Sequence, residues 1–274
     1  MAKSGTGGMA LHQALSFSPV FLRIPRAEAV FWPGCALMTL EPRILAKTLA
    51  VLERAEPGIQ LASGCCGQPT VYLFSEKAPA RLEGLVSRLK KQGVRRIYTA
   101  CPNCAFQLGQ LEGFQIIPIW GVLAEHLTGE DLQRSQGRFV WHDPCPTKAH
   151  SEQRLAARKL LALSGCDVTE PENIRCCGNI QMLRARDPEK SAVLRQRRLA
   201  ELASDRIILS SCEGCLDAFR SEGRETCHLL ELLFGKSKSR GWHNRIRNTL
   251  KTPVKRELRK GISATPVMFS LTGK

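Results

Sequence analysis

Ten of the twelve cysteines fall into two sets with almost the same internal spacing. In both sets an early cysteine is followed by an adjacent pair with a glycine after it, and then by two cysteines separated by two residues. The first cysteine set consists of Cys35, Cys65, Cys66, Cys101 and Cys104, and the second cysteine set consists of Cys145, Cys176, Cys177, Cys212 and Cys215. Thiolates are soft ligands that suit zinc and iron–sulfur clusters. The repeat therefore indicates a duplicated metal-binding unit and favours paired redox centres.

The number of cysteines in each set separates the chemical alternatives. An odd number of thiols cannot pair internally without leaving one over, and a cytoplasmic protein keeps its thiols reduced. A structural zinc ion takes four ligands, so one cysteine in each set would stay unused. An iron–sulfur cluster is therefore favoured, while zinc and thiol chemistry without a metal remain as alternatives.

The residues beside the cysteines agree with a cluster. Neighbouring side chains in extended backbone point to opposite faces, so an adjacent pair reaches two irons of one cluster more readily than it chelates one ion. Gly67 and Gly178 allow backbone angles or close approaches that a side chain would block. The two CxxC loops aim both sulfurs at one place and leave amides free to donate to sulfide.

The segments that must position these cysteines alternate between short apolar runs and longer amphipathic stretches. This alternation predicts βαβ units with a mainly parallel sheet. The expected strands are 29–35, 95–101, 138–145 and 206–212, and the expected helices are 43–55, 76–93, 152–165 and 187–202, with apolar helix starts at 122–129 and 228–235. Ligand crevices form at the carboxyl ends of parallel strands. Thiols that are remote in the sequence can therefore meet at that edge.

The repeat also predicts how the chain is divided. We expect an α/β fold of two tandem, pseudo-symmetric open-sheet βα domains, with clusters at the C-terminal strand edges and a basic C-terminal tail. The expected parts are a leader at 1–28, a first domain at 29–135, a second domain at 136–235 and a basic amphipathic or disordered tail at 236–274.

The net charge of +15 is concentrated in that tail. Residues 236–274 carry 11 Lys and Arg and one acidic residue, which leaves only +5 for residues 1–235. With 6% aromatic residues and no basic face in the body, nucleic-acid binding is not expected. No apolar run approaches the roughly 18 residues that cross a bilayer, and no secretory signal is visible, so a cytoplasmic protein is expected.

The tail has a helical pattern of its own. Apolar side chains recur every four residues with basic residues between them, at Trp242, Ile246, Leu250, Val254 and Leu258. This pattern predicts a basic amphipathic helix, which Pro253 would break or kink. Docking on the cytoplasmic face of an anionic membrane, docking on an acidic partner subunit and a solvated extension are all compatible with it.

The remaining cysteines and histidines have simpler interpretations. Cys166 and Cys227 lie outside both sets and are expected to be small buried side chains. His142 lies three residues before Cys145, where it could donate a hydrogen bond to a cluster or carry a proton, but a satisfied histidine at a strand end is favoured. The spacing of the others does not suggest ligation: His126, His150 and His228.

The complete pattern resembles a known family. It reads C–x29–CCG–x33–CxxC and then C–x30–CCG–x33–CxxC, with FWPGC, HDPC, CCGQP, TACPNC and LSSCEGC as the local words. This is similar to the CCG, or cysteine-rich, domain of the heterodisulfide reductase B-subunit. The module also occurs in iron–sulfur subunits of glycolate oxidase, anaerobic glycerol-3-phosphate dehydrogenase and lactate-utilisation systems. The resemblance extends over residues 29–235.

The resemblance implies a function and a ligand set. Each cysteine set would hold one 4Fe–4S cluster, either cubane or non-cubane, with all five of its thiols as ligands. The protein would reduce a disulfide between the clusters, or transfer electrons between a flavoprotein or ferredoxin-type partner and an acceptor. No tightly spaced CxxCxxCxxxCP run is present, so the electrons are expected from another polypeptide. The alternative function is a zinc-stapled cysteine-rich scaffold without redox activity. No catalytic residue is assigned.

Overall fold

The computed structural model describes residues 6–133 and 137–250, and within them the chain forms two sheets of four parallel strands. The first sheet has the order β2-β1-β3-β4, and the second has the order β6-β5-β7-β8. The strands are β1 Ala29–Trp32, β2 Gln60–Leu61, β3 Arg96–Thr99, β4 Gln115–Pro118, β5 Arg138–Trp141, β6 Asp167–Thr169, β7 Ile207–Ser210 and β8 Thr226–His228. The two halves therefore repeat one topology, which confirms the expected tandem α/β architecture.

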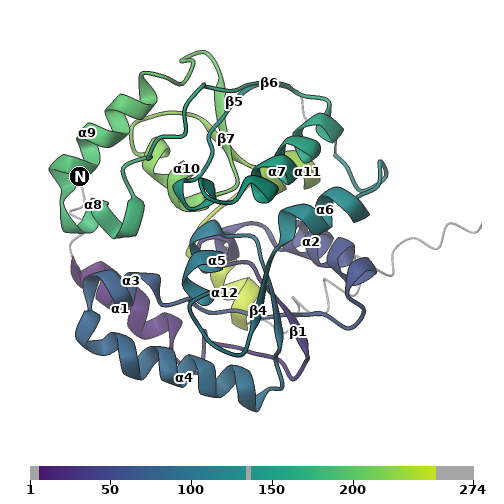
Figure 1. Cartoon of the computed structure of the whole chain (residues 1–274), viewed down its shortest axis with the longest axis vertical. Helices are drawn as coiled ribbons and strands as arrows, with labels where there is room; N and C mark the ends of the chain where they lie inside the picture. Colours follow the sequence, from purple (N-terminus) through teal and green to yellow (C-terminus); the bar gives the residue numbers. More distant parts are fainter. Residues whose placement is uncertain (1–5, 134–136, 251–274) are drawn as a thin grey trace, which may run out of the picture.

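A shared layer of helices lies between the sheets, near the middle of the molecule in Figure 1. It contains α2 Pro42–Ala55 and α6 Ile119–His126 from the first half, and α7 Ser151–Ser164 and α11 Leu229–Phe234 from the second. Their apolar side chains form one continuous buried cluster that reaches both sheets, from Phe31 on β1 to Trp141 on β5. The two repeats are thus held together by a common hydrophobic core.

The outer faces of the sheets are covered by other helices. α4 Ala78–Lys91 and α5 Pro102–Leu108 pack on the first sheet, and α9 Pro188–Leu199 and α10 Glu213–Arg220 lie over the second. The expected long helices are present within a few residues of their predicted bounds. The pattern did not indicate β2, β4, β6 or β8, of which β2, β6 and β8 are only two or three residues long.

Two terminal helices pack against the first half, α1 Thr6–Ser16 and α12 Trp242–Leu250. The part of the leader that the structure describes is therefore ordered. The expected apolar stripe of α12 is exposed at Trp242 and Ile246, whereas the polar Asn244 and Asn248 are buried. The reason is hydrogen bonding: the Asn248 amide donates to the carbonyls of Met38 and Leu40 at 2.8 and 2.9 Å. Val254 and Leu258 lie outside the described residues.

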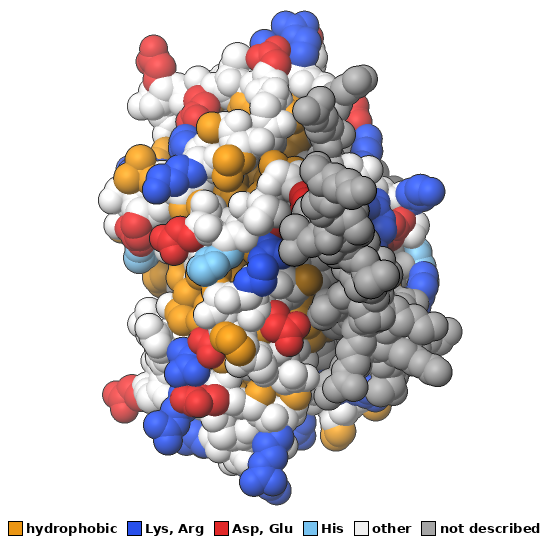
Figure 2. Space-filling view, turned by 90° about the vertical axis from the view of Figure 1, so that its right-hand side faces the viewer, with side chains coloured by type: hydrophobic (Ala, Val, Ile, Leu, Met, Phe, Trp, Pro, Cys, Tyr) orange, Lys and Arg blue, Asp and Glu red, His pale blue; other side chains and the backbone are white. Residues whose placement is uncertain are grey.

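On the face shown in Figure 2, basic and acidic side chains of the described residues are interspersed and do not gather into one basic patch. Among the described residues, no helix combines the length and the apolar character that crossing a bilayer requires.

His228 begins α11 within the shared layer. Its buried imidazole accepts a hydrogen bond from the Leu230 amide at 3.2 Å, and Glu231 accepts one from the His228 amide at 3.0 Å. This reciprocal arrangement is a capping box. Burial and the neighbouring Arg240 lower the pKa of His228 to about 3, so the ring is neutral in the folded protein.

We predict that His228→Asn weakens the pH dependence of stability while keeping a capping side chain. In the unfolded chain a histidine takes up a proton near pH 6.5, whereas folded His228 does not, so the wild type loses stability as the pH falls below about 6.5. Urea unfolding at about pH 7.5 and about pH 5.5 measures the slope. Equal slopes for His228→Asn and wild type would contradict the prediction.

Candidate metal centres

The structure brings all five thiols of the first cysteine set together. Cys35 follows β1, the pair Cys65 and Cys66 follows β2, and Cys101 follows β3 and begins α5, which carries Cys104 in its first turn. Each thiol contacts the next in the order Cys35, Cys65, Cys66, Cys104, Cys101. The carboxyl ends of three neighbouring strands thus supply one group of sulfurs.

The second cysteine set repeats this arrangement. Its sulfurs come from the segments after β5, β6 and β7 and from the first turn of α10. The contacts run in the equivalent order, Cys145, Cys176, Cys177, Cys215, Cys212. The repeat in the sequence is therefore also a repeat in the structure, and equivalent sulfurs make equivalent contacts in the two sets.

Hydrogen bonds stabilise thiolates within the first set. Hydrogen bonds from Cys35 and Cys66 hold the pKa of Cys65 well below its usual range, although burial opposes this. The Cys104 thiol lowers the pKa of Cys101, with help from the backbone amides of Asn103 and Cys104. Those amides lie at the start of α5, where free N–H groups favour an anionic sulfur. The first cysteine set therefore contains thiolates, which can bind a metal cation.

The second set shows the same electrostatics. Hydrogen bonds from the Cys145 and Cys177 thiols lower the pKa of Cys176 to about 2 against the effect of burial. Backbone amides add to this, and the Gly178 N–H donates to the Cys176 sulfur at 3.2 Å. Thiolate is the form that binds metal, so both sets have the chemistry of metal sites.

The glycine after each cysteine pair is required by the backbone. Gly67 and Gly178 have φ of 90° and 86°, a left-handed conformation that side chains disfavour. A Cβ at Gly178 would also lie 2.3 Å from the backbone oxygen of Ser191, and a Cβ at Gly67 would lie 2.7 Å from a methyl of Leu82. The glycines therefore let the two loops turn tightly against the neighbouring helices.

One asparagine links the two cysteine sets. Asn103, between the two cysteines of the first CxxC, donates from its amide to the sulfur of Cys212 at 3.4 Å. Its carbonyl oxygen accepts from the Gln68 amide at 3.3 Å, and Gln68 follows Gly67 directly. A hydrogen-bonded path thus leads from the first CCG loop to a thiol of the second set. The two sets are neighbours across the interface between the halves.

A cavity of about 310 Å³ opens on the first set. All five of its cysteines line the cavity, together with groups from the second half and from the terminal helices, among them Asn179, Glu213, Gly214, His12, Trp242 and Arg245. A much smaller space of about 20 Å³ lies at the second set and shares Asn103, Asn179 and Gly214 with the larger cavity region. The first set is therefore the one with room for a ligand beyond its own sulfurs.

The sequence did not indicate the side chains of the two terminal helices that lie beside the first cysteine set. Gln13 on α1 is fully buried and donates to the Cys65 sulfur at 3.4 Å. The hydrogen bond with Cys65 and burial raise the pKa of Cys35, and the positive charge of Arg245 on α12 opposes this rise. Neither residue has a spacing that indicates a site, because each reaches the cysteines only through the packing of a terminal helix.

The other candidates lie as follows. Cys227 is buried in the shared core, as expected, whereas Cys166 is only half-buried and packs against that core. His228 is a helix cap. The ring of His142 is fully buried and lies near Cys177 and Cys215, so the interpretation as an ordinary strand-end histidine is incomplete.

Comparison with known families identifies the repeat. The model of the cysteine-rich domain, CCG, matches residues 29–109 and 139–220. The chain belongs to the CCG cysteine-rich domain family. Each matched segment contains one complete cysteine set, so the family assignment and the two groups of sulfurs describe the same two units. A metal-binding role agrees with this family and with the thiolate chemistry of both sets.

Other comparisons contribute less. No curated protein matches the chain. Among solved structures, it is similar to an aspartate racemase of Picrophilus torridus, with 11% identity, coverage of 80% of this chain and 97% of that chain, and a TM-score of 0.31. An allantoin racemase of Klebsiella pneumoniae has 17% identity, coverage of 90% and 97%, and a TM-score of 0.28.

We predict that Gly178→Ala empties the second cysteine set of metal, because the added methyl would collide with the Ser191 carbonyl. Gly165→Ala is the matched control: its φ is +66° and nothing lies within 4 Å of the new Cβ. The control should lose about 1–2 kcal/mol of unfolding free energy and keep its metal. Metal analysis per chain and urea unfolding measure both effects. Full metal content in Gly178→Ala would show that the loop tolerates a side chain.

Proposed function

We propose that each cysteine set holds one four-iron iron–sulfur cluster, and that the protein is a redox subunit of the heterodisulfide reductase B type. It would reduce a disulfide, or transfer electrons between a flavoprotein or ferredoxin-type partner and an acceptor. The observation that carries this proposal is the pair of five-sulfur groups with equivalent contacts, joined across the interface by Asn103 and Cys212.

The sulfur count favours iron over zinc. Five thiols converge in each set, and a tetrahedral zinc site would use four of them. N–H donors also surround the sulfurs, including the Gln13 and Asn103 side chains and the Gly178 amide. Hydrogen bonds to sulfur are a principal way in which proteins set the potential of iron–sulfur clusters. The same donors would have no redox role around zinc.

Two adjacent centres suit the reduction of a disulfide. Iron–sulfur clusters, when bound, supply electrons one at a time. A disulfide takes up two electrons and two protons as its sulfur–sulfur bond breaks and two thiols form. The electrons would come from a reduced flavoprotein or ferredoxin-type partner. The residues of this chain would hold the disulfide in the cavity beside the first set. Asn103, Asn179 and Gly214 line this cavity and also the smaller space at the second set.

Arg245 indicates which disulfide the cavity would favour. Arg245 is 4% exposed, and its guanidinium lies 5.3 Å from the Phe21 ring and 4.7 Å from the Trp242 ring and donates to the Ser16 hydroxyl at 2.6 Å. No carboxylate of the described residues forms an ion pair with it. A buried cation without a carboxylate partner favours an anionic ligand, because the pair offsets the cost of burial. We therefore propose a substrate that carries a carboxylate.

Anaerobic purification tests the cofactor assignment. We expect a brown protein with absorbance near about 400 nm and about eight irons per chain. Cys65→Ser and Cys176→Ser should each lose about half of the iron and sulfide, because each removes a ligand from one centre only. Electron paramagnetic resonance of the reduced variants identifies the surviving centre. A colourless protein with bound zinc would support the scaffold alternative, and equal loss of both signals would show that the sets share one centre.

Substitution of Arg245 tests the substrate class. Arg245→Gln should raise KM about tenfold or more for a disulfide bearing carboxylates, since one charged hydrogen-bond partner is lost. The KM for an uncharged disulfide of similar size should change little. Arg247→Gln, on the exposed face of the same helix, is the matched control. An equal effect on both substrates would assign Arg245 to the electrostatics of the first centre and not to substrate binding.

A further inference from the structure

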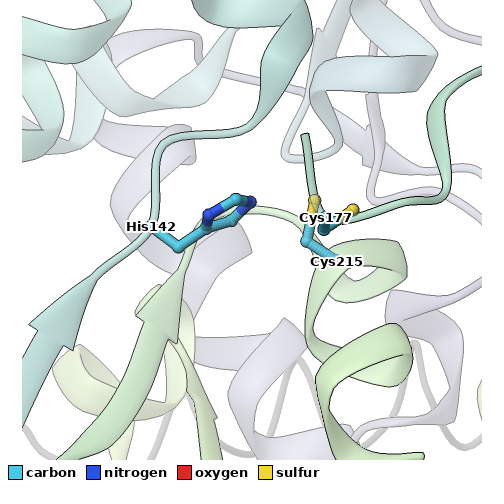
Figure 3. A group of neighbouring side chains, drawn as sticks. All are labelled: His142, Cys177 and Cys215. Carbon is cyan, nitrogen blue, oxygen red and sulfur yellow. The ribbon is translucent and has the colours of Figure 1, made fainter. Parts of the chain in front are cut away.

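The ring of His142 is directed at two sulfurs of the second cysteine set. A ring nitrogen of His142 and the sulfurs of Cys177 and Cys215 lie within 4.8 Å of one another, and all three residues are buried. Figure 3 shows the nitrogen farther from the backbone turned towards the two sulfurs. This trio has the composition of a metal site, so the role of the imidazole depends on which nitrogen carries the proton.

Arg198 fixes the position of that proton. Its Nε–H donates to His142 Nδ1 at 3.1 Å, and a guanidinium has no acceptor. Nδ1 must therefore present its lone pair, which places the proton of the neutral ring on Nε2. Because Nδ1 accepts from a guanidinium and carries no proton, the ring is neutral.

The contacts of Arg198 and of the ring hold this arrangement in place. Arg198 is 1% exposed and donates to the Asn173 carbonyl at 2.9 Å and to Glu201 at 3.0 Å. The Phe219 ring packs edge-on against the imidazole, with 4.9 Å between ring centroids. Neither the guanidinium nor the imidazole is free to turn without breaking buried contacts.

The Nε2–H lacks a partner among the described residues, although it is fully buried. Such a donor costs about 1–3 kcal/mol unless something accepts from it. A metal-ligating histidine normally donates its other N–H to a carboxylate, a carbonyl or water. In His142 the other nitrogen, Nδ1, faces the Arg198 N–H, which is a donor. Ligation through Nε2 would place the ring proton on Nδ1, so two N–H groups would face each other without an acceptor. The orphaned group therefore fits a hydrogen bond to sulfur and not a bond to metal.

The equivalent position of the first half supports this assignment. Trp32 and His142 each lie three residues before the first cysteine of their set. Trp32 is also fully buried, and its indole N–H also lacks a partner among the described residues. An indole can donate a hydrogen bond but cannot ligate a metal as a neutral ring. Both repeats therefore carry a buried N–H donor at this position.

We propose that His142 donates its Nε2–H to a sulfur of the second metal centre, positioned by Arg198, and is not a metal ligand. This rests on the proposed iron–sulfur function. Hydrogen bonds to cluster sulfur favour the reduced, more negative form, so this bond would raise the potential of the second centre. Because a histidine stands where the first half has a tryptophan, the donor can be changed at one centre alone.

A redox titration of His142→Leu and His142→Gln, followed by electron paramagnetic resonance, tests the proposal. His142→Leu should keep its iron and reduce the equilibrium constant for reduction of the second centre about tenfold, a shift of about 59 mV for one electron. His142→Gln retains an N–H and should shift less. The first centre is the internal control and should not move. An unchanged potential in His142→Leu would overturn the proposal.

X-ray absorption spectroscopy of the Cys65→Ser variant, which retains only the second centre, separates a donor from a ligand without relying on activity. We expect a metal shell of sulfur and iron alone at this centre. A nitrogen ligand that disappears in His142→Leu would overturn the proposal. If the second set held zinc, the proposed iron–sulfur function would fail for that centre. A zinc shell of sulfur alone would still support His142 as a hydrogen-bond donor. A nitrogen ligand in that shell would contradict the donor role.

Discussion

Parallel pairing of the central strands is the constraint on which both groups of sulfurs depend. β1 pairs with β2 on one side and with β3 on the other, and β5 is placed in the same way between β6 and β7. Parallel strands bring their carboxyl ends to one edge of the sheet. Three segments that are remote in the sequence thus deliver cysteines to one place, and a shift in pairing would separate them. The glycine turns then bring each adjacent pair inwards.

The shared helical layer gives the repeat its second level of organisation. α2, α6, α7 and α11 bury a common core, so the sheets are fixed relative to each other and so are their carboxyl edges. This explains how a side chain from the first CxxC can reach a thiol of the second set. The halves differ in what covers their sulfurs, because α1 and α12 both pack on the first half. The cavity beside the first set is a consequence of that asymmetry.

Much of this arrangement could be predicted from the sequence. The cysteine spacing identified both sets and the family, and the apolar runs and periodic stretches identified the central strands and the long helices. The edge strands β2 and β6 were not predictable, since two or three residues carry no periodic signal. The sequence predicted a basic amphipathic helix in the tail but did not indicate which of its faces would be buried. α12 buries Asn244 and Asn248, whose amides satisfy carbonyls of the loop after β1. Asn103, Gln13 and Arg198 act through contacts distant in the sequence, which spacing cannot reveal.

We propose that the ten thiols form two neighbouring iron-binding centres, each with five sulfurs from one repeat. Anomalous X-ray diffraction at the iron absorption edge, from crystals grown without oxygen, tests it most directly. We expect two separate iron peaks, one enclosed by the first cysteine set and one by the second, with Asn103 between them. Anomalous signal only at the zinc edge, or iron bound by cysteines of both repeats at one site, would contradict it.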